Sequence, residues 1–182
     1  MNKLPLILTV ARILVTIPVA YLMTFQTPVL DWIAVILFIA ASITDYYDGY
    51  FARKYNAVTN LGKFLDPVAD KILVTSILVV LLFHQKIDIW MVILFVARDT
   101  FIGGIRAAAS ADGLVIPAQT TGKWKAALQM VAIPFMIVNE LHPNFPNLKV
   151  GYGLLWFSVL LSYISGWDYF KLYLSEKKDT TK

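Results

Sequence analysis

The sequence contains no cysteine, only two histidines and few charged residues. The absence of thiols excludes disulfides and thiolate metal sites. Charged residues make up 15% of the 182 positions, whereas about 25% is typical of soluble domains. Because hydrophobic residues reach 58%, the polar residues cannot cover a water-exposed surface of this size. We therefore expect a lipid bilayer to be the main environment of the protein. The net charge of +4 is not gathered into a basic stripe, so we expect no nucleic-acid partner.

Long hydrophobic runs divide the chain into six segments, each near the roughly 20 residues that a helix needs to cross a bilayer. We therefore predict an all-α membrane protein with six transmembrane helices, at about residues 4–25, 29–50, 67–83, 87–109, 124–138 and 150–173. Residues 1–174 are predicted to form one catalytic domain, and residues 175–182 a polar tail. Arg12 interrupts the first run and no small-residue cleavage site follows it, so we expect this segment to be retained rather than removed as a signal peptide.

Basic residues near the segment ends are distributed unequally. With six spans, eleven lysines and arginines fall on the side of the two termini, whereas Lys86 and Lys149 fall on the other side. Positive charge accumulates on the cytoplasmic side of membrane proteins. Both termini are therefore predicted to face the cytoplasm, in a multi-pass protein of the inner or plasma membrane.

Two aspartates end the second segment, and two begin the third. Asp45 and Asp48 share one helical face with the small residues Gly49 and Ala52, because positions three, four and seven apart lie on the same side of a helix. The small residues leave room for a bulky group to approach the backbone, and Arg53 adds a cation at the end of the segment.

The second pair is Asp66 and Asp70, four residues apart. Asp66 directly precedes Pro67, an order typical of a helix N-cap followed by the first helical residue. We therefore predict that a helix begins there, with Asp70 one turn deeper on the same face. Two carboxylates from each of two adjacent helices are expected to converge at the cytoplasmic face.

A single aspartate in such a place is as often a solvated helix cap as a ligand. Four together need counter-charge, because a carboxylate inside a span costs roughly 2.5–3.5 kcal/mol and neighbouring carboxylates repel one another. Two divalent ions balance four negative charges, and oxygen-only ligands favour Mg²⁺ or Mn²⁺. Zinc is not expected, because His84 and His142 lie in loops on the predicted opposite side. Such a two-metal site suits displacement at phosphorus, which predicts a phosphoryl or phosphatidyl transferase acting on a membrane-bound substrate.

Eight residues within 26 positions resemble the signature of the CDP-alcohol phosphotransferase family. They are Asp45, Asp48, Gly49, Ala52, Arg53, Gly62, Asp66 and Asp70, in the spacing Dx2DGx2ARx8Gx3Dx3D. The resemblance implies that an alcohol attacks a CDP-linked donor and that CMP leaves. It also implies that the four aspartates ligate two metal ions, with Asp70 acting in addition as the base toward the alcohol.

Further similarities, at residues 97–99, 104–106, 122–125 and 129–132, extend the resemblance over the chain. They narrow it to members that join CDP-diacylglycerol and sn-glycerol 3-phosphate into phosphatidylglycerol phosphate, and they imply a homodimer. The residues implied to hold the CDP moiety are Gly49, Ala52, Arg53, Thr59 and Gly62. Two departures stand out: Asp99 replaces a common glutamate, and the N-terminal segment lacks two asparagines, which leaves an N-terminal contact with the donor open.

Four cations are candidates for binding the acceptor phosphate: Arg98, Arg106, Lys123 and Lys125. Arg98 and Arg106 are eight residues apart and so lie on roughly the same face, and the two lysines open the fifth segment. Arg106 and Lys125 can equally reflect membrane topology. Arg98 lies deep in an apolar run, which topology explains poorly.

Two alternatives stay open on the sequence alone. The same chemistry could use phosphatidylglycerol (giving cardiolipin), inositol phosphate or serine as acceptor. An ion or proton transporter could also use intramembrane carboxylates. The position of Asp45, Asp48 and Asp66 at segment ends, beside a cytoplasmic loop, favours an enzyme open to a soluble nucleotide.

Overall fold

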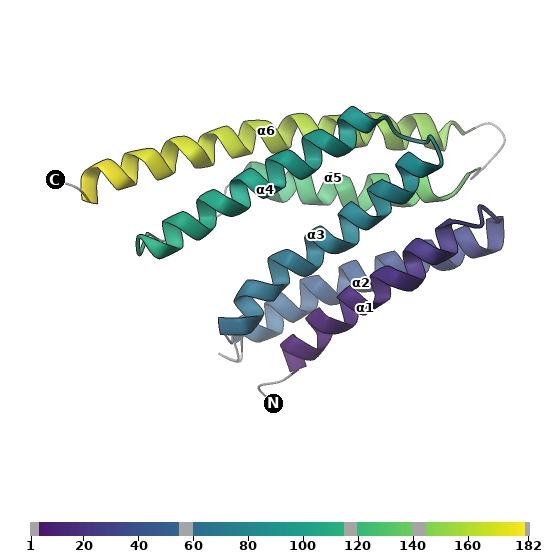
Figure 1. Ribbon diagram of the computed structural model, residues 1–182. Coiled ribbons are helices and arrows are strands. Elements are labelled where there is room, and N and C mark those ends of the chain that lie inside the picture. Colours follow the sequence, from purple (N-terminus) through teal and green to yellow (C-terminus); the bar gives the residue numbers. More distant parts are fainter. Residues whose placement is uncertain (1–3, 55–59, 115–119, 140–144, 181–182) are drawn as a thin grey trace.

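The computed structural model describes residues 4–54, 60–114, 120–139 and 145–180, with the backbone alone at 4–6, 8, 45–54, 60–67, 120–123 and 178–180 (Figure 1). Six α-helices make up this part of the chain. They are α1 (Leu4–Met23), α2 (Pro28–Lys54), α3 (Asn60–Phe83), α4 (Ile89–Ala111), α5 (Thr120–Ile137) and α6 (Asn147–Thr180). The predicted all-α class is therefore confirmed for the described residues.

The helices form an antiparallel bundle with both termini at the same end (Figure 1). Helices α1, α2 and α3 pack together, with α1 against both of the others, and α6 packs against α4 and α5. Contacts of α3 with α4 and α5, and of α2 with α5, join these two groups. One continuous apolar core includes buried residues of all six helices, such as Phe38, Ile77, Met91, Ile133 and Leu155.

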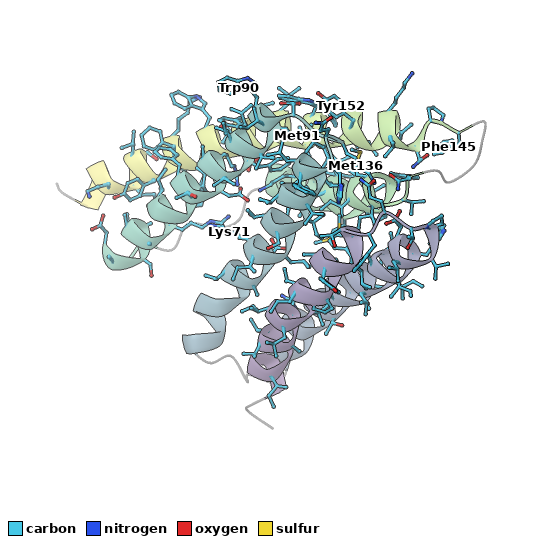
Figure 2. All side chains as sticks on the ribbon, turned by 45° about the vertical axis from the view of Figure 1, so that its right-hand side comes forward. Lys71, Trp90, Met91, Met136, Phe145 and Tyr152 are labelled. Carbon is cyan, nitrogen blue, oxygen red and sulfur yellow. The ribbon has the colours of Figure 1, made fainter. Side chains whose placement is uncertain are left out.

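The outside of the bundle is also apolar. Large hydrophobic side chains lie exposed on every helix, and Trp90 points outward from the bundle with 66% of its surface exposed (Figure 2). Within the described residues, one helix is long and apolar enough to cross a membrane, over Asn147–Lys177, and shorter apolar stretches lie in α1, α2 and α5. Six membrane spans are thus not established for the described residues.

The largest differences from the predicted helix boundaries are at the start of α3 and the end of α6. Helix α3 begins at Asn60, so Asp66 is not its N-cap, and that prediction is wrong. Pro67 lacks the N–H that would bond to the carbonyl four residues before it, yet the backbone is helical on both sides of this residue. At the other end of the chain, α6 continues through Ser175 to Thr180.

Polar side chains close the bundle at the end opposite the termini. The Lys86 ammonium donates to the carbonyls of Met136 (2.9 Å) and Ile137 (2.8 Å), which are left unpaired at the end of α5. The Asn139 amide donates to the buried Asp31 carboxylate (3.2 Å). These bonds tie the start of α2 and the α3–α4 connection to the end of α5.

An exposed carboxylate joins α4 and α6 near the end where the termini lie. Lys177 and Tyr173 donate to Asp112 Oδ2, at 3.0 and 3.1 Å. The bonds from Lys177 and then Tyr173 hold the pKa of Asp112 below its ordinary value.

Helix α6 packs tightly against α5 at Gly151. A Cβ atom there would lie 2.8 Å from Met136 Sδ and 3.1 Å from the Ala132 carbonyl oxygen, whereas a Cβ at Gly153 would meet nothing within 4 Å. We predict that Gly151→Ala lowers the free energy of unfolding by about 1–3 kcal/mol through overpacking. Gly153→Ala, its control on the same helix, should stabilise slightly through helix propensity. Thermal unfolding of the detergent-solubilised protein measures both, and equal shifts would contradict the close packing.

Candidate active site

The backbone brings the two aspartate pairs to matching depths. Asp48 lies six residues before the end of α2, and Asp66 lies six residues after the start of α3. At 1.5 Å per residue, each is about 9 Å from its end of the short connection between the helices. Asp45 and Asp70 are nine and ten residues from these ends, or about 14 and 15 Å. The two pairs of aspartate positions therefore lie at similar heights along the backbones of α2 and α3, measured from the connection between the helices.

Of the four predicted metal ligands, only Asp70 has a described side chain. It is half-buried and interacts electrostatically with Lys125 of α5. Among the described side chains, no group of three or more histidines and carboxylates could hold a metal ion. The remaining metal ligands and the predicted donor-binding residues lie outside the described side chains: Asp45, Asp48, Gly49, Ala52, Arg53, Thr59, Gly62 and Asp66.

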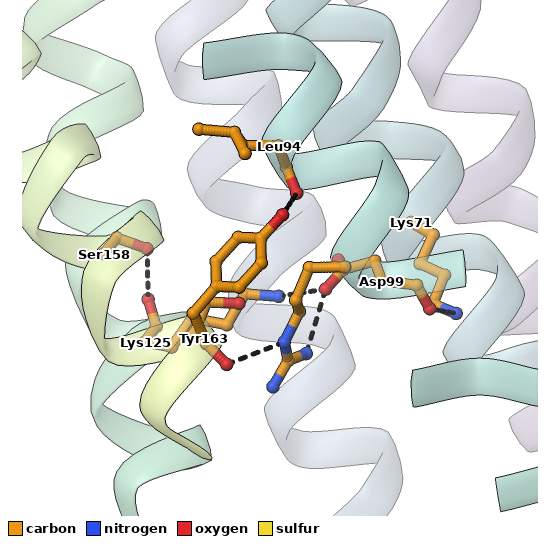
Figure 3. Close-up of polar contacts among 8 residues, drawn as sticks. Lys71, Leu94, Asp99, Lys125, Ser158 and Tyr163 are labelled. Carbon is orange, nitrogen blue, oxygen red and sulfur yellow. Dashed lines mark hydrogen bonds and ion pairs between the residues drawn. The ribbon is translucent and has the colours of Figure 1, made fainter. Parts of the chain in front are cut away.

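A second half of the site is built around Asp99 of α4 (Figure 3). Its Oδ1 atom accepts hydrogen bonds from Lys125 Nζ at 2.6 Å and from Arg98 Nη1 at 3.0 Å. The side chains of Lys125 and Arg98 are only 11% and 12% exposed. Charge-assisted bonds of this kind are short and strong where water is scarce. One carboxylate thus holds two of the predicted acceptor-binding cations together.

Helix α6 forms one hydrogen bond with Arg98 and one with Lys125. Arg98 Nε donates to the Ser162 carbonyl at 2.8 Å, and Ser158 Oγ donates to the Lys125 carbonyl at 3.3 Å. Nearby, the Tyr163 hydroxyl donates to the Leu94 carbonyl at 3.1 Å (Figure 3). The cations therefore project from helices whose spacing is fixed by hydrogen bonds as well as by packing.

The other two predicted acceptor-binding residues are not part of this cluster as described. The Arg106 guanidinium lies over the Tyr169 ring, 5.3 Å from its centroid, and the Arg106 side chain is exposed. The side chain of Lys123 lies outside the described part of the chain. The structure therefore brings Arg98 and Lys125 together and places Arg106 about two turns away along α4.

Two members of the site were not predicted. Asp99 was noted only as a departure from a common glutamate, and Lys71 was not considered, although its ammonium donates to the Asp99 main-chain carbonyl at 2.8 Å. The available signal was an uncompensated lysine well inside an apolar segment, directly after Asp70. Among the described side chains, three cations (Lys71, Arg98 and Lys125) thus accompany two carboxylates (Asp70 and Asp99), and this local excess of positive charge suits an anionic ligand.

Known proteins resemble this chain over most of its length. A family model described as CDP-alcohol phosphatidyltransferase matches residues 2–164. A curated CDP-diacylglycerol–glycerol-3-phosphate 3-phosphatidyltransferase of Rickettsia bellii is 39% identical over 172 residues, covering 93% of this chain and 94% of the relative. The protein of the same name from Bacillus subtilis is 40% identical over 143 residues, covering 79% and 74%. That from Cereibacter sphaeroides is 29% identical over 216 residues, covering 97% and 98%.

The Asp99 cluster makes a prediction about stability. Asp99→Asn removes the negative charge that Arg98 and Lys125 share, leaving two largely buried cations without it. Breaking a buried ion pair costs roughly 3–5 kcal/mol, and we expect about 2 kcal/mol here because water screens partly exposed pairs. Thermal unfolding in detergent should show this loss. The control Asp112→Asn, in an exposed pair on the same helix, should change the unfolding temperature little, and equal effects would contradict the assigned role of Asp99.

Proposed function

The chain belongs to the CDP-alcohol phosphatidyltransferase family, as its aspartate motif predicted, and on this premise we propose that it transfers a phosphatidyl group from CDP-diacylglycerol to sn-glycerol 3-phosphate. The products are phosphatidylglycerol phosphate and CMP, which makes the protein a transferase of phospholipid biosynthesis. The observation that carries this function is the extent of the similarity. Relatives named for this reaction are 39% and 40% identical and cover 93% and 79% of the chain.

In this reaction an acceptor hydroxyl forms a new bond to the phosphatidyl phosphorus. The bond from that phosphorus to the bridging oxygen breaks, and CMP leaves with the electron pair. The hydroxyl proton passes to Asp70, the proposed base. Its half-buried position near Lys125 supports this role, because it puts a carboxylate beside the cations proposed to bind the acceptor.

Two divalent ions, Mg²⁺ or Mn²⁺, fit the four aspartates Asp45, Asp48, Asp66 and Asp70. The matching depths of the two pairs and the need to balance four negative charges support this ligand set. When bound, such ions neutralise the charge of the pyrophosphate and of the leaving CMP.

The donor and the acceptor are proposed to bind different residues of the site. The residues proposed to hold the CDP moiety are Gly49, Ala52, Arg53, Thr59 and Gly62. Small residues let a nucleotide approach the backbone, and an arginine can pair with its phosphates.

The acceptor phosphate is proposed to bind Arg98 and Lys125, with Arg106 and Lys123 at the entrance. A guanidinium has five N–H donors and an ammonium three, so the bonds of Arg98 and Lys125 to Asp99 and Ser162 leave donors for phosphate oxygens. A neutral acceptor would have no use for this excess of positive charge.

We further propose that the six helices span the inner or plasma membrane, with both termini and the active site at the cytoplasmic face and a homodimer as the assembled form. The antiparallel bundle with its termini at one end supports the orientation (Figure 1). The apolar outer surface supports a lipid environment.

The identity of the acceptor can be tested by measuring how much CMP is released with each candidate alcohol. Purified protein in detergent, given CDP-diacylglycerol and Mg²⁺, should release CMP only when sn-glycerol 3-phosphate is added, and phosphatidylglycerol phosphate should accumulate in equal amount. EDTA should stop the reaction, and added Mg²⁺ or Mn²⁺ should restore it. Equal CMP release with phosphatidylglycerol, inositol phosphate or serine would contradict the proposed acceptor.

The role of Asp70 is tested separately. Asp70→Asn removes the base and should lower kcat by about 10²–10⁴-fold, the usual contribution of general-base catalysis, while the donor still binds. The matched control is Asp88→Asn at the other end of the bundle, where asparagine can replace the aspartate as N-cap of α4. Steady-state CMP release measures both variants, and an active Asp70→Asn enzyme would exclude Asp70 as the base.

A further inference from the structure

Lys71 lies beside the proposed base and reaches across to a neighbouring helix. From α3, its ammonium donates to the main-chain carbonyl of Asp99 on α4, at 2.8 Å (Figure 3). The preceding residue, Asp70, interacts with Lys125, which itself donates to the Asp99 carboxylate at 2.6 Å. Lys71 thus bonds directly to Asp99, and the adjacent Asp70 carboxylate acts through its charge on Lys125, another partner of Asp99.

A glycine makes this contact possible. A Cβ atom at Gly103, one turn after Asp99, would lie 2.7 Å from Lys71 Nζ. The ammonium therefore occupies space that any other residue at 103 would fill. At the adjacent Gly104 a Cβ would meet nothing within 4 Å, so the close approach is specific to Gly103.

Stability alone is a poor reason for a lysine at this place. Partly burying an ammonium costs free energy, and a bond to one neutral carbonyl offsets only part of that cost. An apolar side chain of similar length would pack between α3 and α4 without that cost.

The position of a catalytic base is, in contrast, a strict requirement. A base must lie within hydrogen-bond reach of the proton that it accepts, and a displacement of 1 Å can cost about 10²-fold in rate.

We propose that Lys71 is a positioning residue for the proposed phosphatidyl transfer, and that Gly103 is the notch in α4 that admits its ammonium. The bond to the Asp99 carbonyl fixes the rotation and height of α3 against α4. It thereby holds the Asp70 carboxylate at a set distance from Arg98 and Lys125, where the acceptor is proposed to bind. This inference rests on the proposed function.

The test compares variants of the full chain in the CMP-release assay with sn-glycerol 3-phosphate. Lys71→Met removes the ammonium and should lower kcat by about 10- to 100-fold, with the KM for CDP-diacylglycerol unchanged. Lys71→Arg, which can still donate to the Asp99 carbonyl, should recover most of this loss. A residue that only stabilised the fold would not give this split between kcat and KM at equal amounts of folded protein, which thermal unfolding verifies for each variant.

The notch gives an independent test that leaves the lysine in place. Gly103→Ala should displace the flexible ammonium and lower kcat as Lys71→Met does, whereas its control Gly104→Ala should keep the activity of the unmodified protein. In the double variant, Gly103→Ala should add no further loss to Lys71→Met, because methionine lacks the displaced nitrogen.

Unchanged kcat in Lys71→Met and Gly103→Ala would overturn the positioning role, and so would losses that only follow the amount of folded protein. These results are distinct from failure of the proposed function. If the unmodified protein released no CMP with sn-glycerol 3-phosphate, the proposed reaction would be wrong and the positioning role would fall with it.

Discussion

The bundle depends on charge balance at one residue, Asp99. Its carboxylate accepts bonds from Arg98 of its own helix and from Lys125 of α5, and its main-chain carbonyl accepts one from Lys71 of α3. Arg98 continues the network to α6 through the Ser162 carbonyl. Four helices therefore meet at a point where water is scarce and an unbalanced charge would be costly. Removing the Asp99 carboxylate would leave Arg98 and Lys125 without the negative charge that they share.

The described structure combines an apolar core, which includes buried residues of all six helices, with two polar clusters. One surrounds Asp99 in the middle of α4, and the other contains Asp31, Lys86 and Asn139 at the end opposite the termini. At the far end, the lysine pairs with the free carbonyls of α5 and stabilises the end of that helix. In the Asp99 cluster the cations outnumber the described carboxylates, an excess that favours binding of an anion over mere closure of the bundle.

Much of this arrangement could be predicted from the sequence, because helix periodicity and hydrophobic length are local properties. The six helical segments were predicted from these properties, and the position of Arg98 deep in an apolar run marked it as more than a topology signal. The aspartate spacing also predicted that each pair shares one helix face, which stays a prediction because most of these side chains lie outside the described ones. The start of α3 was missed because an aspartate–proline pair also fits inside a helix. Arg106 was placed too near Arg98, since eight residues at 100° each leave the two side chains about 80° apart around the helix. The role of Asp99 and the fit of Lys71 at Gly103 depend on contacts between helices distant in sequence, which local patterns do not reveal.

The division of labour among the helices has an evolutionary consequence. The carboxylates of the motif lie on α2 and α3, whereas the cations around Asp99 lie mainly on α4 and α5. If Arg98 and Lys125 bind the acceptor as proposed, substitutions on α4 and α5 can alter which alcohol is accepted without changing the aspartate motif on α2 and α3. Helix α3 is the exception, because consecutive residues face both parts. Its sequence should be the slowest to diverge when a duplicated gene acquires a new acceptor.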